Sequence, residues 1–81
     1  MIKIFTKVNC ANCPKAKELG KVLEKKGCEV VYYDIDTVEG LTEASYFNIM
    51  STPSVILINE TTKKTWLGKV PELNEILTKK A

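Results

Sequence analysis

Apolar residues alternate or cluster along this chain in stretches that have the pattern expected of β-strands. These stretches are residues 2–6, 29–36, 54–59 and 64–67. In the first, Ile2 and Ile4 would lie on one face of a strand and Phe5 on the other. The third, with the sequence SVILIN, is continuously apolar, which is typical of a strand covered on both faces. The pattern therefore predicts four strands, the last of which would end at Gly68.

Helical spacing of apolar residues fills the segments between the strands. The first helix would follow the cysteines at positions 10 and 13 and end at Gly27, because glycine tolerates the left-handed conformation that closes many helices. Thr37 is expected to cap a short helix that runs to about Phe47, with Asn48 in the terminating position. Pro71 is expected to open a final helix. The apolar face of that helix would contain Leu73, Ile76 and Leu77.

The resulting order is β-α-β-α-β-β-α, which predicts an α/β fold with a mixed four-stranded sheet and three helices packed on it. Helical connections would make the first three strands parallel, and a hairpin would make the last pair antiparallel. One domain is expected to span residues 1–81. Trp66 is expected to lie in the core or to cover the sheet. Other large side chains are expected to be packing residues, with Met50 near the Pro53 loop: Tyr32, Tyr33, Tyr46, Phe47 and Met50.

Composition excludes several classes of function. The 81 residues carry a net charge of +2, and their basic side chains are scattered lysines without arginine, which is unlike a nucleic-acid interface. The apolar runs are too short to cross a membrane, and the first strand begins too early for a secretory signal. We therefore expect a cytoplasmic monomer that has no nucleic-acid or membrane partner.

The chain has three cysteines, at positions 10, 13 and 28. In a reducing cytosol, a pair as close as Cys10 and Cys13 is more typical of chemistry than of structural cross-linking. Cys10 would stand where the first strand meets the first helix, and the positive end of the helix dipole favours a thiolate, which lowers the pKa of such a thiol below about 8.5. Cys13 would lie one helical turn further on and be less exposed. This arrangement suits a thiol–disulfide exchange in which Cys10 attacks and Cys13 resolves the mixed disulfide. Cys28 is expected to be a small residue at a loop.

Two kinds of metal site could also use these thiols. A structural zinc site needs four ligands, and the sequence has no histidine and only Cys28 besides the pair. Copper(I) is a better alternative because two thiolates can hold a soft ion. Copper carriers with this cysteine spacing, however, usually have a β-α-β-β-α-β order and a methionine before the first cysteine.

A second signal is Thr52–Pro53, which directly precedes the most apolar strand. A cis bond there would turn the loop towards the cysteine pair, whereas a trans proline would simply begin the strand. The residues alone leave both possibilities open.

Taken together, the segments FTKVNCANCPKAKEL, FNIMSTPSVILIN and GKVPELNEIL resemble small redox-active disulfide proteins of the thioredoxin-fold superfamily, which also contains thioredoxins and glutaredoxins. The resemblance covers nearly the whole chain and implies the minimal thioredoxin fold. It implies that Cys10 is the nucleophile, that Cys13 is the resolving thiol, and that Pro53 is cis and packs against the disulfide. It also implies that the Thr52 backbone binds an extended substrate segment.

Lys7 stands three residues before Cys10, as a lysine does in glutaredoxins, where it would steady a thiolate or a carboxylate; a solvated surface lysine is the alternative. Ala11 and Asn12 match neither thioredoxins nor glutaredoxins between the cysteines, so the direction of electron flow stays open. Gly68 is followed by a lysine, whereas glutaredoxins place two glycines and an acidic residue there to hold glutathione.

The expected function is therefore thiol–disulfide exchange with disulfide-containing protein substrates. A reductase or another dithiol would supply the electrons, and no cofactor is expected. A copper(I) carrier and a glutathione-dependent glutaredoxin are the alternatives.

Overall fold

The computed structural model describes residues 1–8, 10–60, 63–72 and 76. The strands are β1 (Ile2–Thr6), β2 (Val30–Asp34), β3 (Ser54–Ile58) and β4 (Lys63–Trp66), and the helices are α1 (Cys13–Lys25) and α2 (Val38–Tyr46). These elements confirm the predicted strands and the first two predicted helices. The predicted third helix lies mostly outside the described residues. Ile76, within that segment, is helical and fully buried, whereas Pro71 is not helical.

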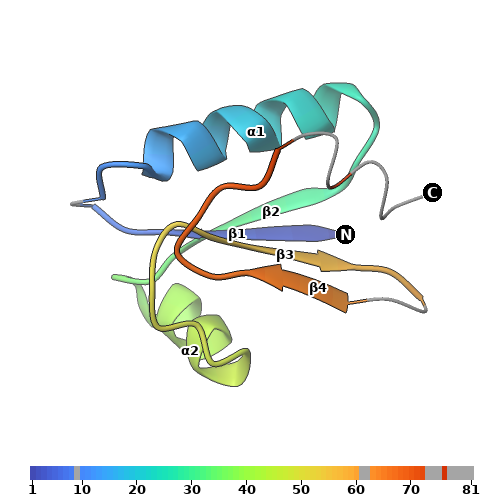
Figure 1. Cartoon of the computed structure of the whole chain (residues 1–81). Helices are drawn as coiled ribbons and strands as arrows, with labels where there is room; N and C mark the ends of the chain where they lie inside the picture. The colour runs from blue at the N-terminus through green and yellow to red at the C-terminus, as the bar shows by residue number, and fades with distance from the viewer. Residues whose placement is uncertain (9, 61–62, 73–75, 77–81) are drawn as a thin grey trace.

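The four strands form one sheet with a helix on each face, α1 on one side and α2 on the other (Figure 1). The alternation in β1 produces this arrangement, because Ile2 and Ile4 join the core under α1 and Phe5 joins the core under α2. β3 is buried along nearly its whole length and contributes to both cores, as its continuous apolar run predicts. The mixed four-stranded α/β sheet is therefore confirmed.

The strand order is β2-β1-β3-β4. β1 and β2 are parallel and β3 and β4 are antiparallel, as predicted, but β3 runs antiparallel to β1, so the prediction of three parallel strands was wrong. Thr6 pairs with Asp34 and Phe5 pairs with Ser54, so β3 begins at the edge of the sheet where β1 and β2 end. The connection through α2 therefore starts and finishes at that one edge, and β3 must run back through the sheet.

The helix ends follow the sequence signals. Gly27 has a φ of 88° and Asn48 a φ of 57°, so both hold the left-handed conformation after their helices. The Thr37 side chain accepts a hydrogen bond from the Gly40 backbone N–H at 3.0 Å, which confirms Thr37 as the N-cap of α2.

Burial separates the large side chains into two groups. Trp66 packs in the core under α1, as predicted. Cys28 lies in the loop between α1 and β2, as expected, and its side chain is buried in the same core. The packing predictions for Met50 and Tyr46 were wrong, because these side chains are 91% and 77% exposed. Met50 falls in the loop before β3, and Tyr46 is the last residue of α2, where its ring contacts the edge of the Phe47 ring. Within the described ranges, no helix has the length and apolar character needed to cross a membrane.

Candidate active site

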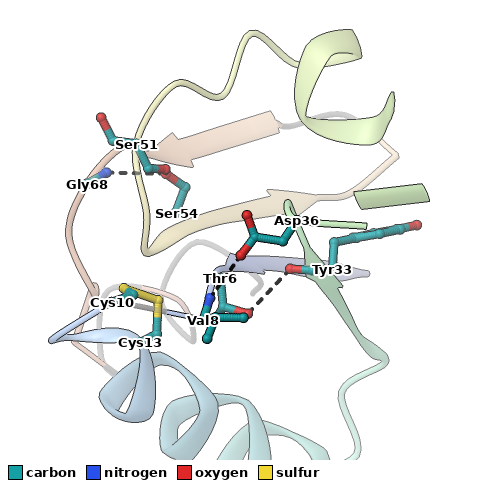
Figure 2. Close-up of a disulfide and its surroundings, with 9 residues drawn as sticks. All are labelled: Thr6, Val8, Cys10, Cys13, Tyr33, Asp36, Ser51, Ser54 and Gly68. Atoms are coloured by element: carbon teal, nitrogen blue, oxygen red, sulfur yellow. Dashed lines mark hydrogen bonds between the residues drawn. A yellow bond between two sulfur atoms is a disulfide. The ribbon is translucent and has the colours of Figure 1, made fainter. Parts of the chain in front are cut away.

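Cys10 and Cys13 lie in the connection between β1 and α1 and form a disulfide, with Cα atoms 5.4 Å apart (Figure 2). α1 begins at Cys13, with Asn12 as its N-cap and Pro14 in its first turn, where the missing N–H breaks no intrahelical bond. Cys10 therefore precedes the helix, and Cys13 is its first residue. Cys10 thus lies at the junction between β1 and α1, as expected, but the expectation that Cys13 lies one turn inside the helix was wrong, because the turn over Ala11 and Asn12 is not part of the helix.

The two sulfurs differ in accessibility. The side chain of Cys13 is buried, with 3% of the residue exposed, whereas Cys10 is partly exposed. Cys10 is therefore the more accessible of the two cysteines. This confirms the predicted difference in exposure.

The loop before β3 forms the opposite side of the site. The Thr52–Pro53 bond is cis, which decides between the two alternatives that the sequence leaves open. A cavity of about 380 Å³ lies between this loop and the cysteine turn. Lys7, Cys10, Thr52 and Pro53 all line it. The structure therefore brings together four of the five predicted site residues in one cavity, with Cys13 buried beside them.

A second, smaller cavity of about 210 Å³ is lined by Asn12, Lys15, Gly68, Lys69 and Val70. Asn12 lines both cavities, so they meet at the turn between the cysteines. The segment after β4 is thereby placed next to the first turn of α1. Lys15 and Lys69 were not among the predicted site residues, because they stand far apart in the sequence.

A buried hydroxyl connects the two loops that border these cavities. Ser54 has no exposed surface, and its Oγ donates a hydrogen bond to the Ser51 carbonyl at 2.6 Å and accepts one from the Gly68 N–H at 3.3 Å (Figure 2). Gly68 has a φ of 69°, a conformation that favours glycine. Sequence reasoning missed Ser54, although a single hydroxyl at the start of an otherwise apolar strand is a signal that could have found it.

The charged side chains around β1 make two different contacts, one near the site and one on the face of the sheet covered by α2. The Asp36 carboxylate accepts a hydrogen bond from the Val8 N–H at 3.2 Å and so holds the chain between β1 and Cys10 against the end of β2 (Figure 2). Among the described residues, an ion pair between Lys3 and Glu43 joins β1 to α2 on the other face of the sheet. In the described part of the chain, no three histidine, cysteine, aspartate or glutamate residues are grouped so that they could hold a metal ion.

Comparison with known proteins agrees with this geometry. The family model for the thioredoxin domain matches residues 1–79. A probable thioredoxin from Archaeoglobus fulgidus is 38% identical over 58 residues, which cover 70% of this chain and 64% of the relative, so the match spans less than two thirds of that protein's length.

Two solved structures share the fold. Thioredoxin 1 from Thermosipho africanus superposes with a TM-score of 0.64 at 16% identity, over 95% of this chain and 85% of that one. The germline-specific thioredoxin Deadhead from Drosophila melanogaster superposes with a TM-score of 0.65 at 18% identity, over 98% of this chain and 75% of that one. At these identities the likeness concerns the fold. With the family model matching residues 1–79, the chain belongs to the thioredoxin family.

Proposed function

We propose that this protein is a cytoplasmic thiol–disulfide oxidoreductase that exchanges disulfides with protein partners. The observation that carries the proposal is the Cys10–Cys13 disulfide, whose partly exposed sulfur lines a cavity opposite Thr52 and Pro53. An accessible sulfur beside a buried one is the arrangement that a two-step exchange requires. Membership of the thioredoxin family supports the same activity.

The exchange begins from the dithiol. The Cys10 thiolate attacks one sulfur of the partner disulfide, the partner's S–S bond breaks, and its other sulfur leaves as a thiolate that takes up a proton from water. The Cys13 thiolate then attacks the Cys10 sulfur and closes the intramolecular disulfide, which releases the second partner thiolate. Two electrons have passed to the partner, and a reductase or another dithiol returns the protein to its reduced form.

The residues around the cavity would orient the partner. Thr52 and the buried Pro53 line the cavity, where Thr52 would offer its backbone to an extended segment that carries the partner disulfide and Pro53 would hold the loop against the cysteine turn. Lys7, which is exposed and lines the cavity, would place a positive charge beside the reacting sulfurs. These roles are inferred from position.

The direct test is the reduction of insulin by dithiothreitol, followed as turbidity. The wild-type protein should accelerate the reaction, and Cys10→Ser should bring the rate to that of dithiothreitol alone. Cys28→Ala serves as the matched control, because Cys28 lies in the core under α1 and lines neither cavity, so this variant should keep the acceleration. Equal rates for wild type and Cys10→Ser would refute the proposal.

The order of the two steps has its own test. Cys13→Ser should trap a mixed disulfide between Cys10 and a disulfide peptide, because no second thiol can release it, and mass spectrometry would detect the adduct. Cys10→Ser should trap less of the same peptide, because the remaining sulfur is buried. A stronger adduct at Cys13 than at Cys10 would reverse the proposed roles.

The two alternatives from the sequence lead to different measurements. The observed element order differs from the β-α-β-β-α-β order expected of a copper carrier, so exchange is favoured, and competition with a copper(I) chelator would show whether the pair binds copper more tightly than a simple dithiol. Glutathione use is tested with glutathione and its reductase as the electron source. Rapid recycling of the oxidised protein would identify a glutaredoxin.

A further inference from the structure

We propose that this protein acts preferentially on disulfides flanked by acidic residues, and that Lys7, Lys15 and Lys69 provide the selectivity. The inference rests on the proposed oxidoreductase function and specifies its substrate class. These three residues are called the lysine rim below.

The lysine rim is assembled from three separate parts of the chain. Lys7 follows β1, Lys15 lies in the first turn of α1, and Lys69 follows β4. The fold brings them to the two cavities that meet at Asn12, Lys7 in one and Lys15 with Lys69 in the other. A chain segment that presents its disulfide to Cys10 would therefore pass a lysine on either side of the reacting sulfurs.

The charge of the lysine rim is not neutralised within the site. Neither cavity is lined by an aspartate or a glutamate among the described residues. All three lysines are exposed, and the ion pair found in the described ranges involves Lys3, on another part of β1. The exposed acidic residues Glu18 and Glu72 line neither cavity.

One acidic side chain does lie near the lysine rim. Asp36 follows β2, and its carboxylate accepts a hydrogen bond from the Val8 N–H, next to Lys7 (Figure 2). It would offset part of the charge of Lys7. Lys15 and Lys69 line the second cavity, which Asp36 does not line, so their positive charge is offset less than that of Lys7.

The physical effect expected of the lysine rim is on association. Exposed charge pairs add little affinity each, but a cluster of like charge around a binding site raises the rate of encounter with an oppositely charged partner by about tenfold or more at low salt. Salt reduces this effect, since the screening length falls from about 30 Å at 0.01 M to about 3 Å at 1 M. The exposed Met50 and Val8 next to the site would contribute apolar contact that does not depend on the partner's charge.

The test uses three peptides of equal length, each with the same internal disulfide and with two aspartates, two serines or two lysines beside each cysteine. Pre-reduced wild-type protein is mixed with each peptide without any other reductant, the reaction is stopped with acid, and reduced peptide is measured by chromatography. At about 0.01 M salt, the aspartate peptide should be reduced about tenfold faster than the lysine peptide, and at about 1 M salt the rates should converge.

Two triple variants distinguish an effect of the lysine rim from an effect of the protein's net charge. Changing Lys7, Lys15 and Lys69 to glutamine should remove most of the preference for the aspartate peptide. The control changes Lys21, Lys25 and Lys26 to glutamine, which lowers the net charge equally at the other end of α1 and should keep the preference.

The possible outcomes distinguish the two proposals. If the wild-type protein reduces none of the peptides, the oxidoreductase function is refuted. If it reduces the serine peptide but treats the aspartate and lysine peptides alike at low salt, the selectivity alone is refuted. An equal loss of preference in both triple variants would also overturn the proposal, because the preference would then come from net charge and not from the lysine rim.

Discussion

Replacing Ser54 by alanine should destabilise the protein and release the loop that contains Gly68. In the structure, the Ser54 Oγ is fully buried and joins the Ser51 carbonyl to the Gly68 N–H at 2.6 and 3.3 Å. Alanine fills nearly the same space but offers neither a donor nor an acceptor. The change therefore tests the hydrogen bonds themselves with little change in packing.

The magnitude follows from the number of bonds and from what replaces them. Each intramolecular hydrogen bond contributes about 0.5–1.5 kcal/mol net, and a polar group left buried without a partner costs about 1–3 kcal/mol. Ser51 and Gly68 are exposed residues, so water can form hydrogen bonds with the Ser51 carbonyl and the Gly68 N–H in the variant. This limits the free-energy cost of losing the serine hydroxyl. We expect a loss of about 2 kcal/mol in the free energy of unfolding, from the two bonds together. In a chain of this size that corresponds to a fall of about 10 °C in Tm.

Urea unfolding of the oxidised protein, followed by circular dichroism, measures the free energy, and NMR hydrogen exchange measures protection of the Gly68 amide. Ser54→Ala should lose stability and expose that amide to faster exchange, while Ser54→Thr, which keeps the hydroxyl, should protect the amide better than alanine does. Ser45→Ala is the matched control, because Ser45 is exposed on α2 and should change stability by less than about 0.5 kcal/mol. Unchanged Gly68 exchange in Ser54→Ala would refute the reasoning, whatever the stability.

Three further predictions concern close packing and ionisation. Gly40→Ala should cost about 3 kcal/mol or more in urea unfolding, because a Cβ on Gly40 would overlap the backbone carbonyl of Asp34, which cannot move without moving β2; a loss below 1 kcal/mol would show that the helix can shift. Gly20→Ala should cost less, about 1–2 kcal/mol in the same assay, because its Cβ would meet the ends of two side chains, Tyr32 and the buried Ile4, which can shift, and alanine favours the helix; a loss as large as that of Gly40→Ala would contradict this. Burial raises the pKa of Tyr32 from 10.0 to about 12, with smaller effects from the hydrogen bond to Glu24 and from the charge of Glu24. Because the protonated phenol is favoured in the folded protein, the stability that it contributes is complete below pH 10 and is lost as the pH rises from 10 towards 12. Absorbance at 295 nm should show a late phenolate transition that Tyr32→Phe abolishes and Glu24→Gln moves to lower pH, and a transition unaffected by Glu24→Gln would exclude that carboxylate as a cause.

The local elements could be predicted because their signals lie within short stretches of chain. The continuous apolar run at residues 54–59 corresponds to β3, which is covered on both faces, and Gly27 and Asn48 end their helices in the left-handed conformation that their residue types allow. Thr37 caps α2 through its side chain, as its position suggested. The helix ends depend on interactions between residues within about one turn of each other, and the burial of β3 is indicated by its own continuous apolar run, so in each case a short stretch of sequence contains the signal.

The direction of β3 could not be predicted in this way. A helix between two strands suggested a parallel crossover, but the chain re-enters the sheet at the edge that it left, as the pairing of Phe5 with Ser54 shows. The exposure of Met50 and the burial of Ser54 also depend on which loop packs against which, and similar local sequences are compatible with either outcome. The same holds for Lys69, whose place beside Lys15 depends on the path of the chain after β4.

The sequence by itself determined the chemistry and the building blocks: a pair of thiols three positions apart, a proline ahead of the most apolar strand, and the periods that make each strand and helix. Tertiary structure alone decided that β3 runs antiparallel to β1, that Met50 is exposed and Ser54 buried, and that Lys69 lies beside Lys15. The physical reason is the range of the interactions involved. Periodicity and capping act between neighbours along the chain, whereas accessibility and charge at a site depend on the packing of segments that are distant in sequence.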